Sequence, residues 1–380
     1  MEERNLKIKI KKKIIKLIIF LKKRNIIKII IELYLFVVLI KISIARSYNV
    51  NYQNTIHFEN KSLSDNIINK INNLSPFKED KNNIINKKQI HISMSLDNNL
   101  VYPTLVSMTS ALENNNKNQN VLVYYLLLEN NFNITNIEIF ESLKIKYQVN
   151  INYYIIPKIF NNLRRWTLNT ECIYYKLILP YLFKNLKRII YLDGDTLIYK
   201  DISEMYELDF NENYVLGYPF SSPEVLDKFG IYSINYINGG VLLFNLEKIR
   251  KENKTNDLLE CTIQHNEKLE YLEQDSINLV LYPKTGFLPL KYGVYLMRNL
   301  TIFNKYIKYK LRFRINKIEL KKAFNNPSIL HFSGCYPKIW NKKSISEFFI
   351  DDYCKIIQKD FYYYANKTNY YLIMYNLYLM

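Results

Sequence analysis

The sequence predicts an α/β fold in which a single domain is built on a Rossmann-like, doubly wound mixed sheet. Two observations predict it. Short apolar runs alternate with segments of helical period from residue 89 onward, and this alternation favours a largely parallel sheet. In addition, two of the apolar runs end on aspartate, at Asp97 and Asp193. Ligands bind such sheets beyond the carboxyl ends of the strands, so the sequence predicts a ligand site at that edge.

The predicted elements follow one another along the chain. Residues 89–97 form the first expected strand, and a helix is expected over 102–113. Further strands are expected at 121–128, 151–156 and 188–192, and further helices at 134–147 and 172–182. One more buried strand is expected within 235–245, where apolar residues follow a glycine pair. Strands without polar alternation are typical of sheets covered on both faces.

Both ends of the chain differ in composition from this domain. Residues 49–88 are polar, rich in Asn and Lys, and show no sustained period, as is typical of a linker. We expect four parts: a signal peptide or signal anchor over 1–45, a low-complexity stem over 46–88, the main domain over 89–345, and an aromatic tail over 346–380.

The amino terminus has the order of a secretory signal. It is basic through Arg24 and apolar from Ile26 to Ile40, and it then offers the small residues Ser43 and Ala45. A cleaved signal peptide and a signal anchor both fit, and each predicts a lumenal location in the ER or Golgi, either membrane-anchored or secreted. A basic amphipathic helix on a membrane surface, or a nuclear-type basic run, is the alternative.

The formal net charge of +18 does not point to a nucleic-acid partner, because of where the charge lies. Half of it, +9, falls within residues 1–45. The rest of the chain has no continuous basic stripe with interleaved aromatic residues, which is the usual footprint of nucleic-acid binding. We therefore expect no nucleic-acid partner.

The most informative segment runs from Arg188 to Tyr199, where an apolar strand stops on Asp193, Gly194 and Asp195. Two aspartates at positions i and i+2 of an extended chain point to the same side, so both can reach one ion. Hard oxygen ligands suit Mg²⁺ or Mn²⁺. Asp-Gly is also a common turn dipeptide, and the motif alone does not decide between a metal site and a turn.

Other polar segments accompany this motif further along the chain. The sequence has only eight glycines, and such a chain is expected to keep them where the backbone approaches a ligand or φ is positive. Four of them are Gly194, Gly239, Gly240 and Gly334. The segments are Tyr174–Lys176, Asn235–Asn245, Glu273–Asn278 and His331–Trp340.

The order of these segments resembles the retaining glycosyltransferases of family 8. These include bacterial lipopolysaccharide galactosyl- and glucosyltransferases and, more distantly, glycogenin. The resemblance runs from about Ile90 to Trp340. It implies a GT-A type fold, a UDP-sugar donor with Mn²⁺ (or Mg²⁺), and transfer of glucose or galactose to a glycan or glycoconjugate acceptor. A catalytically weak, lectin-like carbohydrate-binding protein on the same fold is the alternative.

The resemblance also implies a role for each matching residue. Asp193, Asp195 and His331 match the metal ligands, and Gln274 with Asp275 match the catalytic polar pair beneath the anomeric carbon. Among the expected donor contacts, Asp97 and Asn99 match those to uracil and ribose, Asn238 and Glu273 those to sugar hydroxyls, and Gly334 one to phosphate. The remaining expected donor contacts are Lys176, Gly239 and Lys338, of which Lys338 is the best cation for the leaving UDP.

The chain departs from the family's pattern in two places. Family members usually have arginine where Lys176 stands, and lysine loses the bidentate geometry of a guanidinium. The usual terminal motif reads His-x-x-Gly-x-x-Lys-Pro-Trp, whereas here Pro337 intrudes and Ile339 replaces proline, so Lys338 is shifted by one residue. Beyond Trp340 the aromatic tail either attaches to a membrane through interfacial tyrosines, as in bacterial relatives, or forms a final helix packed on the core.

Overall fold

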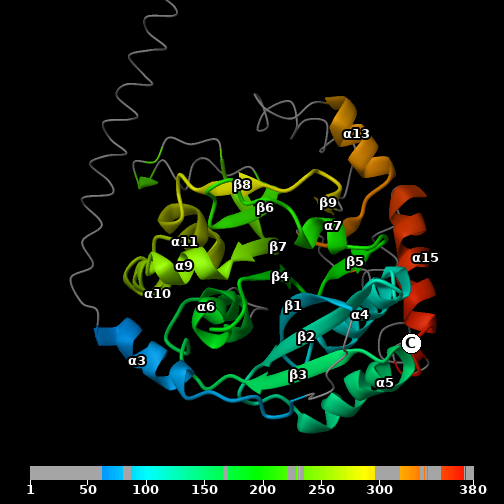
Figure 1. The fold of residues 1–380 in the computed structure, drawn as a ribbon, viewed down its shortest axis with the longest axis horizontal. Coiled ribbons are helices and arrows are strands. Elements are labelled where there is room, and N and C mark those ends of the chain that lie inside the picture. The colour runs from blue at the N-terminus through cyan, green and yellow to red at the C-terminus, as the bar shows by residue number, and fades with distance from the viewer. Residues whose placement is uncertain are drawn as a thin grey trace, which may run out of the picture. The chain divides into compact units, whose positions relative to one another are not determined.

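The computed structural model describes the main domain and the chain that borders it (Figure 1). The described residues are 62–79, 87–165, 170–220, 235–295, 317–333 and 352–371, together with a few isolated positions such as Lys338 and Trp340. The predicted signal segment over 1–45 and Gly334 lie outside them. Within the described part of the chain, no helix is long and apolar enough to cross a membrane.

The main sheet has seven strands in the order β3-β2-β1-β4-β7-β6-β8. The first four in this order are parallel: β3 (Asn150–Ile155), β2 (Asn120–Leu128), β1 (Lys88–Leu96) and β4 (Arg188–Leu192). β7 (Ile237–Asn245) runs antiparallel to both of its neighbours, and β6 (Val215–Pro219) is parallel to β8 (Thr285–Phe287). The predicted mixed, doubly wound sheet is confirmed, and its strand order reverses between β1 and β4.

Helices cover both faces of this sheet, as alternate residues of β4 illustrate. Ile190 and Leu192 pack into one apolar cluster together with α4 (Val101–Asn114) and α5 (Ile137–Tyr147). The short 3₁₀ helix η1 (Ile134–Asn136) directly precedes α5. Ile189 and Tyr191 pack into the other. On that second face lie η2 (Glu171–Ile178), α6 (Leu179–Leu182), α9 (Leu246–Lys251), α10 (Lys254–Gln264) and α11 (Glu273–Val280).

One predicted helix, over 172–182, is only partly α-helical. Residues Glu171–Ile178 form the 3₁₀ helix η2, and a single α-turn, α6, follows. The physical reason is Pro180, which has no N–H to donate to the carbonyl of Lys176 and whose ring would clash with that carbonyl in a continuous α-helix. The chain therefore changes helix type just before the proline.

A second, three-stranded sheet was not predicted. It has the order β5-β10-β9, with β5 (Thr196–Ile198) antiparallel to β10 (Ile329–His331) and β10 parallel to β9 (Tyr292–Tyr295). His331 pairs with Thr196, which directly follows Asp195. This small sheet therefore brings together two motifs that lie far apart in the sequence. Two further short helices are α7 (Ser203–Tyr206) and α13 (Lys317–Asn325).

Part of the expected stem belongs to the folded domain, which corrects the prediction for residues 62–79. Helix α3 (Ser62–Asn72) buries Ile67, Ile68 and Ile71 against α6 and α10. Phe77 and Lys78 then pair with the backbone of Tyr153 on the edge strand β3. The isoleucines at i, i+1 and i+4 form one apolar face, a short signal within an otherwise Asn-rich segment.

The aromatic tail contains a helix that packs on the core. Helix α15 (Asp352–Asn366) lies against α4 and buries Ile357, Phe361 and Ala365. The ring of Phe361 stacks on Trp340, with 5.7 Å between ring centroids. For this stretch the structure corresponds to the packed-helix alternative, while Tyr363 stays exposed.

Candidate functional site

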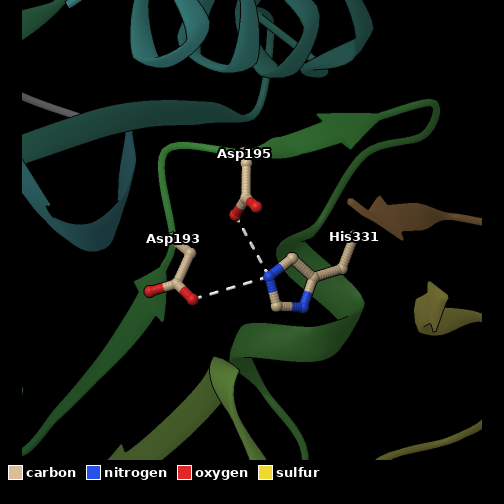
Figure 2. Close-up of side chains that lie close together, drawn as sticks. All are labelled: Asp193, Asp195 and His331. Atoms are coloured by element: carbon tan, nitrogen blue, oxygen red, sulfur yellow. Dashed lines mark hydrogen bonds and ion pairs between the residues drawn. The ribbon is translucent and has the colours of Figure 1, made fainter. Parts of the chain in front are cut away.

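Three side chains that the sequence analysis assigned to a metal converge at the end of β4, and we call them the metal cluster: Asp193, Asp195 and His331 (Figure 2). His331 Nε2 lies 3.1 Å from Asp195 Oδ1 and 3.5 Å from Asp193 Oδ2. One potential ligand atom from each residue lies within 4.8 Å of the other two. Asp193 is held at the end of β4 because its N–H donates to the carbonyl of Gly240 on β7.

The spacing and chemistry of the metal cluster fit a divalent ion. Two atoms that each lie about 2.1 Å from one octahedral ion are about 3 Å apart, close to the distances seen here. Two carboxylates and one imidazole are a donor set that suits Mn²⁺. The backbone of Gly240 lies against this set, since an added Cβ would come within 2.1 Å of His331 Cε1 and 2.4 Å of Asp193 Oδ2. Any side chain at this position would displace the ligands.

The charges of the metal cluster are strongly coupled. Burial alone would lower the pKa of His331, but Asp195 and Asp193 outweigh it and raise that pKa to about 9. Burial raises the pKa of Asp195, but Lys338 and His331 outweigh it and hold this pKa well below its usual range. At neutral pH, His331 is therefore protonated between two ionised carboxylates. A divalent ion would have to displace that proton, as is general for metal binding to histidine.

Lys338 reaches the metal cluster in spite of its shift by one residue. Its Nζ donates to Asp195 Oδ2 at 2.5 Å and to the carbonyl of Phe332 at 2.7 Å. It also lies 5.8 Å from the centroid of the Trp340 ring. A cation therefore sits beside the carboxylates, where the predicted leaving phosphate would need one.

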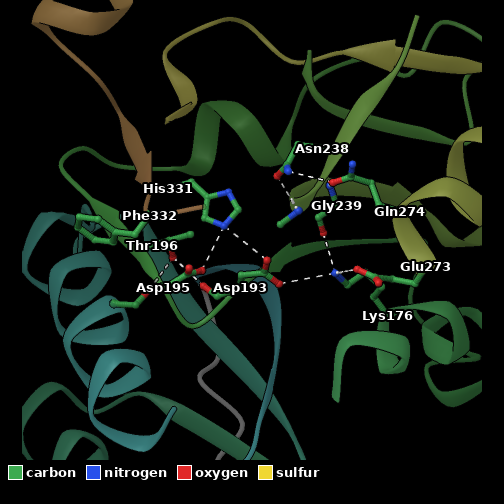
Figure 3. A network of polar contacts seen from close by, with 12 residues as sticks. Lys176, Asp193, Asp195, Thr196, Asn238, Gly239, Glu273, Gln274, His331 and Phe332 are labelled. Carbon is green, nitrogen blue, oxygen red and sulfur yellow. Dashed lines mark hydrogen bonds and ion pairs between the residues drawn. The ribbon is translucent and has the colours of Figure 1, made fainter. Parts of the chain in front are cut away.

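Next to the cluster lies a set of buried polar side chains that we call the polar network: Lys176, Asn238, Glu273, Gln274 and Asp275. Figure 3 shows the first four of them. Lys176 is 2% exposed. Its Nζ donates to Glu273 Oε1 at 2.9 Å and to the Gly239 carbonyl at 3.0 Å, and it lies 3.6 Å from Asp193 Oδ1. The contacts to Glu273 and Gly239 are hydrogen bonds, whereas Asp193 lies at the longer distance of an ion pair.

The charges on Lys176 and Glu273 depend on each other. Burial lowers the pKa of Lys176, but Asp193 and Glu273 outweigh it, and the net shift is upward. Burial raises the pKa of Glu273, and Lys176 opposes that shift. Lys176 therefore links the metal cluster to the polar network. Its expected contact with the donor stays a prediction, because protein acceptors already surround its ammonium.

Gln274 and Asn238 form a second layer of the polar network. Gln274 Oε1 accepts from Asn238 Nδ2 at 3.0 Å and from the N–H of Gly239 at 2.8 Å. Asn238 Oδ1 accepts from the N–H of Gly240 at 2.9 Å. The glycine pair on β7 is therefore fixed by the amides that the sequence analysis assigned to sugar contacts and catalysis.

Asp275 has structural partners for both of its oxygens. The hydroxyl of Tyr236 donates to Oδ1, and the N–H groups of Glu270 and Tyr271 donate to Oδ2 at 2.6 and 2.8 Å. Burial raises the pKa of Asp275 in spite of these bonds. The carboxylate therefore anchors the turn before α11, and its expected catalytic role stays a prediction.

Asp97 and Asn99 lie where predicted, at the end of β1 beside β4. Asp97 Oδ1 accepts from the N–H of Asn99 at 2.9 Å and of Leu100 at 3.0 Å, and Asn99 Nδ2 donates to Asp97 Oδ2 at 3.1 Å. The pair thus stabilises the turn into α4. Contact with a nucleotide stays a prediction, as does the phosphate contact of Gly334.

Two supporting residues were not singled out from the sequence. Tyr236 joins Gln274 to Asp275, since its hydroxyl accepts from Gln274 Nε2 and donates to the carboxylate. Asn278 clamps α11 to β7 by bonding both the N–H and the carbonyl of Ile237 at 2.8 Å. Each lies close in sequence to a candidate residue, and a polar side chain between buried apolar neighbours must find hydrogen-bond partners. These two features could have indicated both residues from the sequence.

Residues 91–344 match the sequence profile described as "Glycosyl transferase family 8". The chain belongs to this family. Among its relatives, General stress protein A of Bacillus subtilis (strain 168) is 27% identical over 184 residues, which are 46% of this chain and 61% of that protein. A lipopolysaccharide 1,2-glucosyltransferase of Escherichia coli is 27% identical over 169 residues, 41% of this chain and 49% of that protein. The family 8 chain thus spans about half the length of the curated relatives it matches.

Solved structures share the fold. The bifunctional glycosyltransferase WbbM aligns with a TM-score of 0.62 at 19% identity, over 79% of this chain and 53% of its own. The galactosyltransferase LgtC, in complex with donor and acceptor sugar analogs, aligns with a TM-score of 0.60 at 16% identity, over 74% of this chain and 96% of its own. At this identity the likeness concerns the fold, and the predicted GT-A type fold of this family 8 chain is confirmed.

Proposed function

We propose that this protein is a metal-dependent retaining glycosyltransferase that moves a hexose, glucose or galactose, from a UDP-sugar to a glycan or glycoconjugate acceptor. The observation that carries the proposal is the convergence of Asp193, Asp195 and His331 on one point at the switch between β1 and β4. Family membership supports the reaction class. The hexose and the ion, Mn²⁺ in preference to Mg²⁺, rest on the family resemblance and the donor set.

The residues of the chain would share the work of such a transfer. A bound divalent ion would offset the negative charge that develops on the departing diphosphate. The Lys338 ammonium, on Asp195, would add a second positive charge on the same side. Asn238 and Gln274 would orient the sugar from the other side, because their amides are already fixed to each other and to the backbone of β7.

The hydrogen bonds of the polar network favour a front-face route for retention. Gln274 Oε1 already accepts two hydrogen bonds, and both oxygens of Asp275 accept bonds from protein groups. A carboxylate or amide oxygen that acts as a nucleophile has to release such partners first. In the front-face route the departing phosphate itself takes the proton of the acceptor hydroxyl. The hydrogen bonds of Gln274 and Asp275 then do not have to break.

The proposed location is the ER or Golgi lumen, with the protein anchored to a membrane or secreted. Its support is the basic, then apolar, then small-residue order of positions 1–45, which lie outside the described residues. Expression of the full chain with a carboxyl-terminal reporter would test it. Resistance of the reporter to protease in intact microsomes is expected, and digestion would contradict a lumenal location.

The experiment that tests the proposed reaction is release of UDP from a panel of UDP-sugars with Mn²⁺, Mg²⁺ or a chelator. We expect release from UDP-glucose or UDP-galactose that stops when the chelator is added. As a control, Asp209→Asn should release UDP as the wild-type protein does. Asp209 is exposed and, among the interactions described, bonds only the N–H of Asn211. Binding of UDP-sugars without turnover of any donor would instead favour the lectin-like alternative.

A further inference from the structure

The face of α4 that packs against β5 carries buried hydroxyl groups, although apolar residues would pack there without needing partners. Ser107 and Ser110 are fully buried, and Thr196 on β5 is only 1% exposed. Buried hydroxyls stabilise a fold only when they are hydrogen-bonded. Their hydrogen-bond partners therefore indicate which part of the backbone they support.

The bonds of these hydroxyls form a directed chain that ends on a metal-cluster residue. Thr196 Oγ1 donates its proton to the backbone carbonyl of Asp193 at 3.0 Å. Ser107 Oγ lies 2.8 Å from Thr196 Oγ1. A hydroxyl has one proton, and since Thr196 gives its own to Asp193, Ser107 is the donor between the two. Helix α4 thus reaches the carbonyl of Asp193 through two side chains.

One turn further along α4, Ser110 holds the same strand. Its Oγ accepts from the N–H of Ile198 at 2.9 Å and donates to the carbonyl of Ser107 at 2.7 Å. The strand that follows Asp195 is therefore fixed to α4 at both of its ends. On the opposite side of the loop, the N–H of Phe332 donates to the carbonyl of Asp195 at 2.9 Å.

The loop between β4 and β5 needs such support. It contains Gly194, which has more backbone freedom than any other residue type, directly between two carboxylates that repel each other. Thr104 of α4 also limits it, because a Cβ on Gly194 would lie 2.3 Å from Thr104 Oγ1. Without fixed carbonyls, the two aspartates would sample separations too large for one ion, and binding would have to restore the order.

We propose that Ser107 and Thr196 are positioning residues for the metal cluster: they hold the carbonyl of Asp193 so that its carboxylate stays in reach of Asp195 and His331. The inference rests on the proposed function, since it concerns the same ion. In this proposal neither hydroxyl is a ligand of the ion, and both act through the backbone of Asp193.

The test compares Mn²⁺ affinity, measured by calorimetry with the chelator-treated protein, across matched variants. Thr196→Val keeps the shape but removes the donor to Asp193, and we expect Mn²⁺ affinity to fall about tenfold. Ser107→Ala should lower it in the same direction by a smaller factor, and the two changes together should fall short of the product of their separate factors. Thr196→Ser keeps the hydroxyl and should restore the affinity.

A control on the same helix separates positioning from stability. Thr109 is also fully buried, but its hydroxyl donates to Leu105 O of its own helix at 2.7 Å. Thr109→Val should therefore leave Mn²⁺ affinity unchanged, whatever it does to the melting temperature. Wild-type affinity in Thr196→Val, or an equal loss in Thr109→Val, would overturn the inference alone. Absence of Mn²⁺ binding and UDP release in the wild-type protein would overturn the proposed function, and the inference with it.

Discussion

The metal cluster and the polar network lie side by side at one edge of the sheet, but they are held together in different ways. In the cluster, the side chains of Asp193 and Asp195 remain 34% and 14% exposed and face the same point. In the network, Lys176 and Asp275 are almost fully buried, and their charged groups hydrogen-bond to other parts of the protein. The cluster therefore presents partly exposed ligand atoms to one point, whereas the side chains of the network bond mainly to one another and to the backbone. Substitutions in the cluster should abolish binding and spare the fold, and substitutions in the network should lower stability.

The largest expected effect is loss of activity at the cluster. Asp195→Ala should lower Mn²⁺-dependent UDP release on the order of 10³-fold, because one of two carboxylate ligands is gone. The circular dichroism spectrum should match that of the wild-type protein. If UDP binding by this variant still responded to Mn²⁺, the assignment of the metal ligands would be refuted.

Removal of the buried cation should have the next largest effect, and it acts on stability. Lys176→Met leaves Glu273 and Asp193 without their shared ammonium, which should lower the free energy of unfolding by about 3–5 kcal/mol. Urea denaturation measures this loss. The control is Lys248→Met, because its ion pairs with Glu212 and Glu252 lie at the surface and should contribute little to stability. Similar losses in both variants would contradict the contrast between cluster and network.

Substitutions in helix α3 should, like those in the polar network, lower stability without changing metal binding. Ile71 is 1% exposed and belongs to the apolar cluster that also contains Ile277 of α11. Ile71→Ala should lower the free energy of unfolding by about 2–4 kcal/mol and leave Mn²⁺ affinity unchanged. Ile145→Ala is the control, because Ile145 is 83% exposed. A protein that begins at residue 88 and is as stable as one that begins at residue 62 would show that α3 is a stem after all.

The smallest expected effect concerns a single hydroxyl in the network. Tyr236→Phe removes the donor to Asp275 and the acceptor for Gln274, which should lower the free energy of unfolding by about 1–2 kcal/mol. UDP release should change less than in Asp195→Ala, because Gln274 keeps its bonds to Asn238 and Gly239. Tyr363→Phe, at an exposed tyrosine, should change neither quantity.

The parts of this molecule that could be predicted from sequence are those with local signals. Continuous apolar runs predicted β1, β2, β3 and β4 to within about one residue, and the position of Asp193 after such a run predicted the edge at which it lies. The small sheet had no such signal. Its strands β5 and β10 are three residues each, and their pairing joins segments more than a hundred residues apart, which no local pattern encodes.

The candidate site divides in the same way. Residue types and their order predicted which side chains gather, but not what each one bonds. Lys176 was expected to face the donor, and its partners Glu273 and the Gly239 carbonyl follow only from the packing of η2 against α11 and β7. Pro180 shows the converse, since a local rule about proline was available and predicts the interrupted helix over 172–182.

The proposed reaction depends most directly on the position of one ion. Crystals soaked with Mn²⁺ and UDP, measured at the manganese absorption edge, would show that position as an anomalous difference peak. We expect one peak about 2.1 Å from the nearest oxygens of Asp193 and Asp195 and from His331 Nε2. A peak bound elsewhere, or no peak while UDP is bound, would contradict the metal cluster as the centre of the site.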